Sequence, residues 1–131
     1  NLSKANLSGA KFYGADLSKI NLSNANLSGA NIDYANLSGA KLIEADLSNA
    51  NLYGSNFSGA NLSGANLSNS NLSGIDIDYA DLSGTNLTGA DLTGADLSYS
   101  NLTGANLSEI NLTGAILCNT ETPWGMDYSG C

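Results

Sequence analysis

The side chains in this sequence that could do chemistry are mainly carboxylates. Five aspartates lie close together in the second half of the chain: Asp76, Asp78, Asp81, Asp91 and Asp96. Such a group could dock a basic surface, or bind Ca²⁺ weakly through its carboxylate oxygens. The alternative is that Asp only replaces Asn at positions that tolerate both residues.

No residue pattern indicates an enzyme. The chain has no His, so the usual general acid-base residue near neutral pH is missing. Its many Ser hydroxyls have no imidazole to activate them, and no nucleotide-binding loop or metal-ligand constellation is visible. We therefore expect no catalytic residue, no cofactor and no metal site.

Cys118 and Cys131 are the only cysteines, and both lie in the C-terminal tail. A bridge between them would close a loop of about 14 residues, which stabilises a fold by roughly 3 kcal/mol in the loop-entropy description. The alternatives are two free thiols or a metal pair. The metal alternative is weak because structural zinc sites need further Cys or His ligands.

A period of five residues organises the whole chain. Every fifth residue from Leu2 to Leu117 is Leu, Ile or Phe, and the residue two places earlier is Ala at most sites. Asn or Asp precedes the large apolar residue, and Ser or Thr and then Gly mostly follow it. This period fits neither the 3.6-residue turn of a helix nor the two-residue alternation of a strand. We expect each quintet to form one side of a coil, with its large and small apolar side chains inside.

The sequence resembles the pentapeptide-repeat family, whose pattern A-(D/N)-L-x-x is matched by Ala5-Asn6-Leu7-Ser8-Gly9 and by successive quintets through Leu117. The resemblance implies an all-β fold, a right-handed quadrilateral parallel β-helix with four quintets in each coil. Residues 1–117 would then form about six coils. Residues 118–131 would form a C-terminal cap bracketed by the disulfide, with Trp124 folded over the open end of the shaft.

The stacking of residues 20 apart places candidate docking residues together. It puts Asp76 beneath Asp96, about 5 Å apart, which costs stability unless a cation or a partner is present. It also puts Tyr79 beneath Tyr99, and exposed aromatic side chains can anchor a partner. The alternative is that stacked tyrosines only cover the wall. Tyr13 and Tyr53 lie two coils apart on another side, whereas Tyr34 and Tyr128 add little to either interpretation.

The composition limits the partners. The net charge is −8, so direct binding to nucleic-acid phosphates is not expected. No apolar run approaches the roughly 20 residues that span a bilayer. We expect a non-enzymatic structural or protein-interaction module with flat, mildly acidic faces and another protein as partner.

The open first coil near Asn1 could pair with a second copy. Ladders of stacked hydroxyl side chains, such as Thr93 beneath Thr113, could bind ice or a glycan. The five-residue repeat alone also explains these ladders.

The resemblance also implies an alternative function, because some pentapeptide-repeat proteins imitate DNA and bind DNA gyrase.

The expected localisation depends on whether the two cysteines form a disulfide. A disulfide requires an oxidising compartment, and the 13 formal N-glycosylation sites fit poorly with eukaryotic secretion. The family is abundant in cyanobacteria, so a periplasm or a thylakoid lumen is favoured if the bridge forms, and the cytoplasm otherwise.

Overall fold

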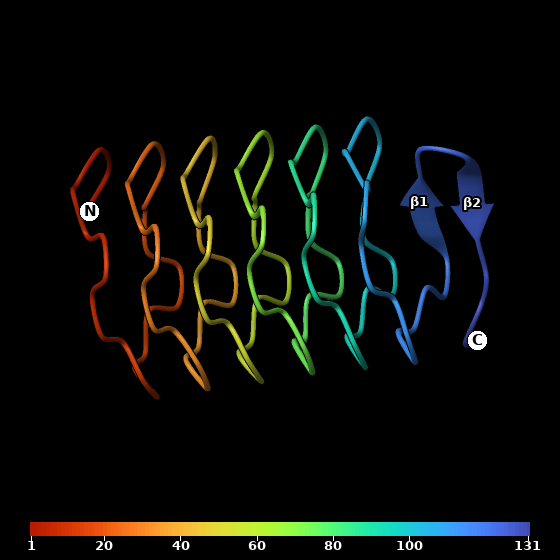
Figure 1. Ribbon diagram of the computed structural model, residues 1–131, viewed down its shortest axis with the longest axis horizontal. Helices are drawn as coiled ribbons and strands as arrows, with labels where there is room; N and C mark the ends of the chain where they lie inside the picture. The colour runs from red at the N-terminus through yellow and green to blue at the C-terminus, as the bar shows by residue number, and fades with distance from the viewer.

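The chain winds into a rod of stacked coils, with its two termini at opposite ends (Figure 1). The computed structural model describes residues 1–131. Parallel bridges join residues 20 apart, from Asn6↔Asn26 to Asn101↔Glu121. Because each five-residue repeat makes one side, a coil of 20 residues has four sides. The predicted stacking of residues 20 apart is confirmed.

The quintet Asn26–Ala30 shows why each position prefers its residue type. The Leu27 N–H donates to a carbonyl of the next coil at 2.7 Å, and the Leu27 carbonyl accepts from the Ala30 N–H at 3.0 Å to close a turn. Gly29 has a φ of 63° within this turn, a conformation that glycine adopts without strain. The Asn26 side chain accepts from the Ser28 N–H at 3.0 Å. Asn therefore stabilises the turn, Gly allows it, and Leu and Ala fill the interior.

Several turns carry a larger residue where Gly29 stands in its quintet, and all of these residues keep a positive φ. Asn tolerates this left-handed conformation better than other side chains, but it is strained for a bulky residue. Tyrosine occupies the position three times, at Tyr34, Tyr79 and Tyr99, with φ between 54° and 59°. The fold thus accepts strained backbone at three points where an aromatic ring leaves the surface.

The interior of the rod is one continuous apolar core. It contains 31 buried residues, almost all of them the Leu, Ile, Phe and Ala side chains of the two inner columns. Phe57 is completely buried near the middle of the rod. Three buried hydroxyls replace Ala in the small column, and each donates to the carbonyl three residues earlier: Ser55, Ser70 and Thr85. A polar group is tolerated there because it finds an acceptor within its own turn.

Ser100 is the exception in the small column. Its hydroxyl is buried and has no hydrogen-bond partner. The acceptor that it would use is the Leu97 carbonyl, which already accepts from the Ser100 N–H and from the Thr120 hydroxyl at 2.7 Å. Since a carbonyl has two lone pairs, no place remains for the Ser100 hydroxyl.

Replacing Ser100 with Ala should stabilise the protein. The substitution removes an unsatisfied buried hydroxyl, whose cost is about 1–3 kcal/mol, and restores the residue that the repeat prefers. We expect the free energy of unfolding to rise by about 1 kcal/mol, measured by urea denaturation. Ser55→Ala is the matched control, because the Ser55 hydroxyl donates to the Leu52 carbonyl at 2.6 Å, and it should give no gain. A loss of stability in Ser100→Ala would contradict this account.

The C-terminal cap is built on one further side of the coil. Strand β1 (Thr120–Thr122) pairs antiparallel with strand β2 (Gly125–Asp127). Glu121 also forms a parallel bridge with Asn101, so the repeat geometry continues past Leu117, and Thr120 and Thr122 are buried there. A disulfide joins Cys118 to Cys131. The structure offers no helix that could cross a membrane.

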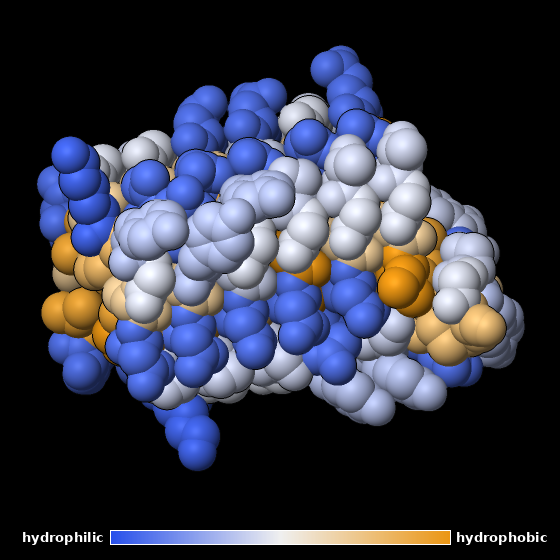
Figure 2. Space-filling model, turned by 90° about the horizontal axis from the view of Figure 1, so that it is seen from below, coloured by the Kyte–Doolittle hydropathy of each residue, from blue (hydrophilic) through white to orange (hydrophobic).

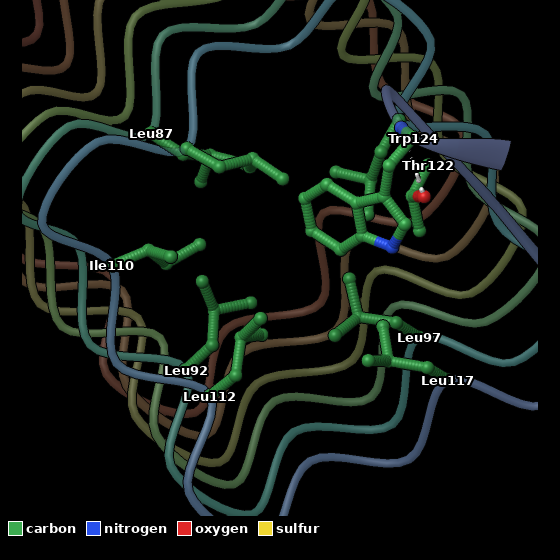
Figure 3. A pocket seen from close by; sticks show the side chains of 10 residues that line it. Leu87, Leu92, Leu97, Ile110, Leu112, Leu117, Thr122 and Trp124 are labelled. Carbon is green, nitrogen blue, oxygen red and sulfur yellow. Dashed lines mark hydrogen bonds between the residues drawn. The ribbon is translucent and has the colours of Figure 1, made fainter. Parts of the chain in front are cut away.

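Trp124 closes part of the end of the shaft. Its indole points into the mouth of the shaft, among Leu87, Leu97 and Leu117 (Figure 3). The remaining cavity measures about 10 Å³, at most about the space that one water molecule needs. Trp124 thus covers part of this end, while Leu107, Ile110 and Leu112 remain only partly buried.

Candidate functional site

The structure brings most of the predicted docking residues onto one side of the rod. Asp76, Asp78, Tyr79, Asp96 and Tyr99 all belong to two stacked quintets, and Asp76 forms a parallel bridge with Asp96. We call these five residues the acidic tyrosine patch. The two remaining aspartates pair in other ladders, between Asn61 and Asn101 for Asp81 and between Asn71 and Asn111 for Asp91. They lie on the two neighbouring sides and not in the patch.

The two tyrosines of the patch stack as expected. The ring centroids of Tyr79 and Tyr99 are 4.8 Å apart, and the planes differ by 5°. Both rings remain mostly accessible, with 61% of Tyr79 and 51% of Tyr99 exposed. Parallel rings standing out from a flat wall are suited to hold a flat group of a partner.

Charge repulsion is built into the patch. Burial raises the pKa of the Asp76 carboxyl, and the neighbouring charges of Asp78 and Asp96 raise it further. Asp91, on the neighbouring side, shows the opposite behaviour. The hydroxyl and then the amide of Thr93 lower the pKa of its carboxyl by donating to it. The negative charge is thus destabilising at Asp76 and stabilising at Asp91.

These opposite shifts predict opposite pH effects. A raised folded-state pKa means that ionised Asp76 destabilises the fold, and this penalty disappears as the pH falls through that pKa. Asp76→Asn should therefore raise the melting temperature at pH 7 by about 1–2 °C and have no effect near about pH 3. Asp91→Asn should lower the melting temperature at pH 7, because its depressed pKa contributes stability that is lost only at lower pH. Equal signs for the two variants at pH 7 would contradict the assignment.

A second aromatic cluster lies on the neighbouring side, and it includes a residue that sequence reasoning missed. The stacking of residues 20 apart does not place Tyr34 over another tyrosine, but its ring contacts both Tyr13 and Tyr53. The centroid distances are 5.8 Å to Tyr13 and 5.4 Å to Tyr53, and the planes differ by 70° and 86°. Counting residues along the repeat does not reveal these contacts, because Tyr34 stands one residue further along its quintet than Tyr13 and Tyr53. A tyrosine ring is long enough to cross between these adjacent columns.

The charge is divided unevenly along the rod. All four lysines lie within residues 1–60, where Asp16, Asp33, Glu44 and Asp46 balance them. Residues 61–131 contain no Lys or Arg, so the entire net charge of −8 belongs to this half. This signal is visible in the sequence only when the two halves are counted separately.

The long side of the rod seen in Figure 2 is largely hydrophilic, and its hydrophobic colour gathers toward the two ends. In the first coil Leu2 is 38% exposed, and in the cap Trp124 is 62% exposed. No group of three His, Cys, Asp or Glu residues could hold a metal ion. Recognition of a partner by polar and aromatic side chains is the chemistry that these sides can perform.

The family model for pentapeptide repeats matches the chain in eight copies, over residues 1–33, 20–59, 55–94 and 95–121. The chain belongs to this family. Membership implies the right-handed quadrilateral β-helix, in agreement with the four-sided coils of the structure. No curated protein is significantly similar to the chain.

Several solved structures are similar to the chain. HetL from the cyanobacterium Nostoc sp. strain PCC 7120, a pentapeptide-repeat protein involved in the regulation of heterocyst differentiation, is 36% identical with a TM-score of 0.40. The match covers 94% of this chain and 64% of HetL. Rfr23 from Cyanothece 51142 is 42% identical with a TM-score of 0.46, covering 77% of this chain and 58% of Rfr23. The chain thus spans about three fifths of the length of these two relatives.

A pentapeptide-repeat protein from the thylakoid lumen of Arabidopsis thaliana is also similar. It is 31% identical with a TM-score of 0.45, and the match covers 81% of this chain and 67% of the plant protein.

Proposed function

We propose that the chain is a non-enzymatic interaction module that docks a basic protein surface on the acidic tyrosine patch. The observation that carries this proposal is the placement of the whole net charge of −8 in residues 61–131. Three carboxylates of that half belong to the same two stacked quintets as the two exposed rings. Opposite charge on a partner would relieve the repulsion at Asp76 and would speed association.

A charge-matched pair of variants tests the proposal. The patch variant carries Asp76→Asn, Asp78→Ser and Asp96→Asn, each the residue that the repeat uses most often at that position. The control variant removes three carboxylates from the other half, through Asp16→Asn, Glu44→Asn and Asp46→Asn. Both lose three negative charges, so a difference between them reports the place of the charge and not its amount.

The variants are compared by cross-linking and affinity capture from the native host, with identification by mass spectrometry. We expect basic proteins to be captured by the unmodified chain and the control variant, and to be lost with the patch variant. Equal capture by all three proteins would overturn the proposal.

Sedimentation of the purified chain tests separately whether two rods pair through the open first coil.

Binding to DNA gyrase as a DNA mimic is the alternative function. The acidic composition favours it, since a duplex presents one negative charge for roughly every 1.7 Å of its axis. The placement of the charge fits less well, because residues 1–60 have no net charge to imitate the duplex. A supercoiling assay separates the two functions: the docking module leaves gyrase activity unchanged at micromolar protein, whereas a mimic inhibits or protects the enzyme.

The disulfide supports an oxidising location, and we propose a bacterial periplasm or a thylakoid lumen. The 13 formal glycosylation sites argue against a eukaryotic secretory route. Alkylation and mass spectrometry of unreduced protein from its native compartment should show no free thiol. Two alkylated cysteines would contradict this location.

A further inference from the structure

Asp33 belongs to the same side of the rod as the second aromatic cluster. It stands in the same column as Tyr13 and Tyr53, 20 residues from each, and its neighbour in sequence is Tyr34. The Tyr34 ring meets both other rings nearly at right angles. The three rings keep accessible surface, with 69% of Tyr13, 54% of Tyr34 and 43% of Tyr53 exposed. Asp33 therefore shares this side of the rod with three aromatic rings that solvent can reach.

The Asp33 carboxylate lacks the hydrogen-bond partners that most other aspartates of the rod have. Its Oδ1 atom is buried and accepts no hydrogen bond. By contrast, the Oδ1 atom of Asp46 accepts from the Ser48 N–H and from the Asn66 side chain. Most quintets have Ser, Thr or Tyr at the position of Asp33. A cation held against the exposed rings would be attracted by this neighbouring carboxylate.

The rings determine which cation fits. An aromatic face attracts a cation placed within about 6 Å of its centroid. A divalent metal ion is disfavoured, because Ca²⁺ requires six to eight oxygen ligands and the cluster has one carboxylate. Rings at right angles let a compact, rounded cation contact more than one of them, whereas a planar guanidinium stacks on one face. The Tyr53 phenol raises the pKa of the Tyr34 hydroxyl, which therefore adds no negative charge to the cluster near neutral pH.

We propose that Tyr13, Asp33, Tyr34 and Tyr53 form a binding site for an alkylammonium cation, such as a quaternary ammonium compound or a methylated lysine side chain. The site lies in the half of the rod that has no net charge and on a different side from the acidic tyrosine patch. An experiment that contradicts this cation site would therefore leave the proposed docking function untouched, and the reverse also holds.

The chain contains its own comparison site. The segment Ile77-Asp78-Tyr79 repeats Ile32-Asp33-Tyr34, and the Oδ1 atom of Asp78 is likewise buried without a partner. The residues 20 before and after Asp78 are Ser58 and Ser98, where Asp33 has tyrosines. This second Asp-Tyr pair keeps the carboxylate but lacks the perpendicular rings, so it should bind the cation more weakly.

Nuclear magnetic resonance of the full-length ¹⁵N-labelled chain tests the site. Choline is the probe, and 3,3-dimethylbutan-1-ol is the neutral molecule of the same shape. We expect choline to shift the Asp33, Tyr34 and Tyr53 amides in a saturable manner, and the neutral alcohol to bind at least about tenfold more weakly. Equal shifts with the two probes, equal shifts around Asp78, or no shift with either choline or the peptide below would overturn the proposal.

Three substitutions by residues that the repeat already uses test the contacts without disturbing the turns: Asp33→Ser, Tyr34→Asn and Tyr53→Ser. Each should weaken binding of the tighter cationic probe about fivefold or more, whereas Asp78→Ser should leave it unchanged. Melting temperatures of the variants check that each remains folded. A short peptide with one trimethyllysine separates the two sources of the cation. Tighter binding of the peptide than of choline indicates a protein partner, and the reverse indicates a small molecule. Unchanged affinity in all three variants would overturn the proposal.

Discussion

Phe57→Ala should lower the free energy of unfolding by about 3–5 kcal/mol, the usual loss when a large aromatic side chain is removed from a core. Phe57 is completely buried, and it lies in the inner column between Leu37 and Ile77. The neighbouring coils are fixed by main-chain hydrogen bonds on every side, so the walls can close little of the cavity. Guanidinium unfolding followed by circular dichroism measures the loss.

Phe12→Ala is the control for this prediction. Phe12 occupies the equivalent repeat position in the first coil, but there it is only partly buried and packs at the edge of the core. The same change of side chain should cost less than half as much, because solvent already reaches the site and the wall has neighbours on one side only. Equal losses of stability at Phe12 and Phe57 would mean that the core is not packed more tightly in the middle of the rod than in its first coil.

The fold could be predicted because a single short period determines it. Once Leu27 and its counterparts are placed inside, the Asn, Ser and Gly between them must form the turn. The position of any side chain then follows from its number modulo 20. The stacking of Tyr79 on Tyr99 is predicted in this way, and the structure confirms it. Repetition thus converts a local steric preference into long-range register.

The features that could not be predicted depend on side-chain reach or on the cap. Tyr34 joins Tyr13 and Tyr53 because its ring extends across two columns, which column counting treats as separate. The Ser100 hydroxyl is unsatisfied because Thr120, which follows the last quintet of the five-residue sequence pattern, takes its acceptor. In both cases the backbone follows the prediction, but the contacts depend on side chains that the repeat does not specify.

The acidic tyrosine patch illustrates the same limit in another form. Proximity along the chain groups five aspartates, whereas the coil distributes them over three sides, with Asp81 and Asp91 apart from the others. Proximity in sequence and proximity in space differ here because each side lasts only five residues. The uneven charge of the two halves is readable from the sequence, but the net charge of the whole chain conceals it.

Removing the disulfide should have the second-largest effect on stability. Cys118 and Cys131 are 13 residues apart and enclose the whole hairpin of β1 and β2. A loop of this size contributes about 3 kcal/mol when it is closed covalently. After Asp127 the chain is attached to the rod by the bridge and by the hydrogen bond from the Leu117 N–H to the Ser129 carbonyl. The double variant Cys118→Ser/Cys131→Ser should therefore unfold at a lower guanidinium concentration.

Amide hydrogen exchange shows which coils lose stability when the disulfide is removed. In a solenoid each coil contacts only its neighbours, so an unfastened cap should loosen the last coil before the middle of the rod. We expect the Leu117 amide to exchange at least about tenfold faster in the double variant, and the Leu62 amide, in the middle of the rod, to change little. A reductant should reproduce this pattern in the unmodified chain and have no effect on the double variant. If exchange at Leu62 accelerated as much as at Leu117, the rod would unfold as one unit, and the disulfide would stabilise all of it rather than its end.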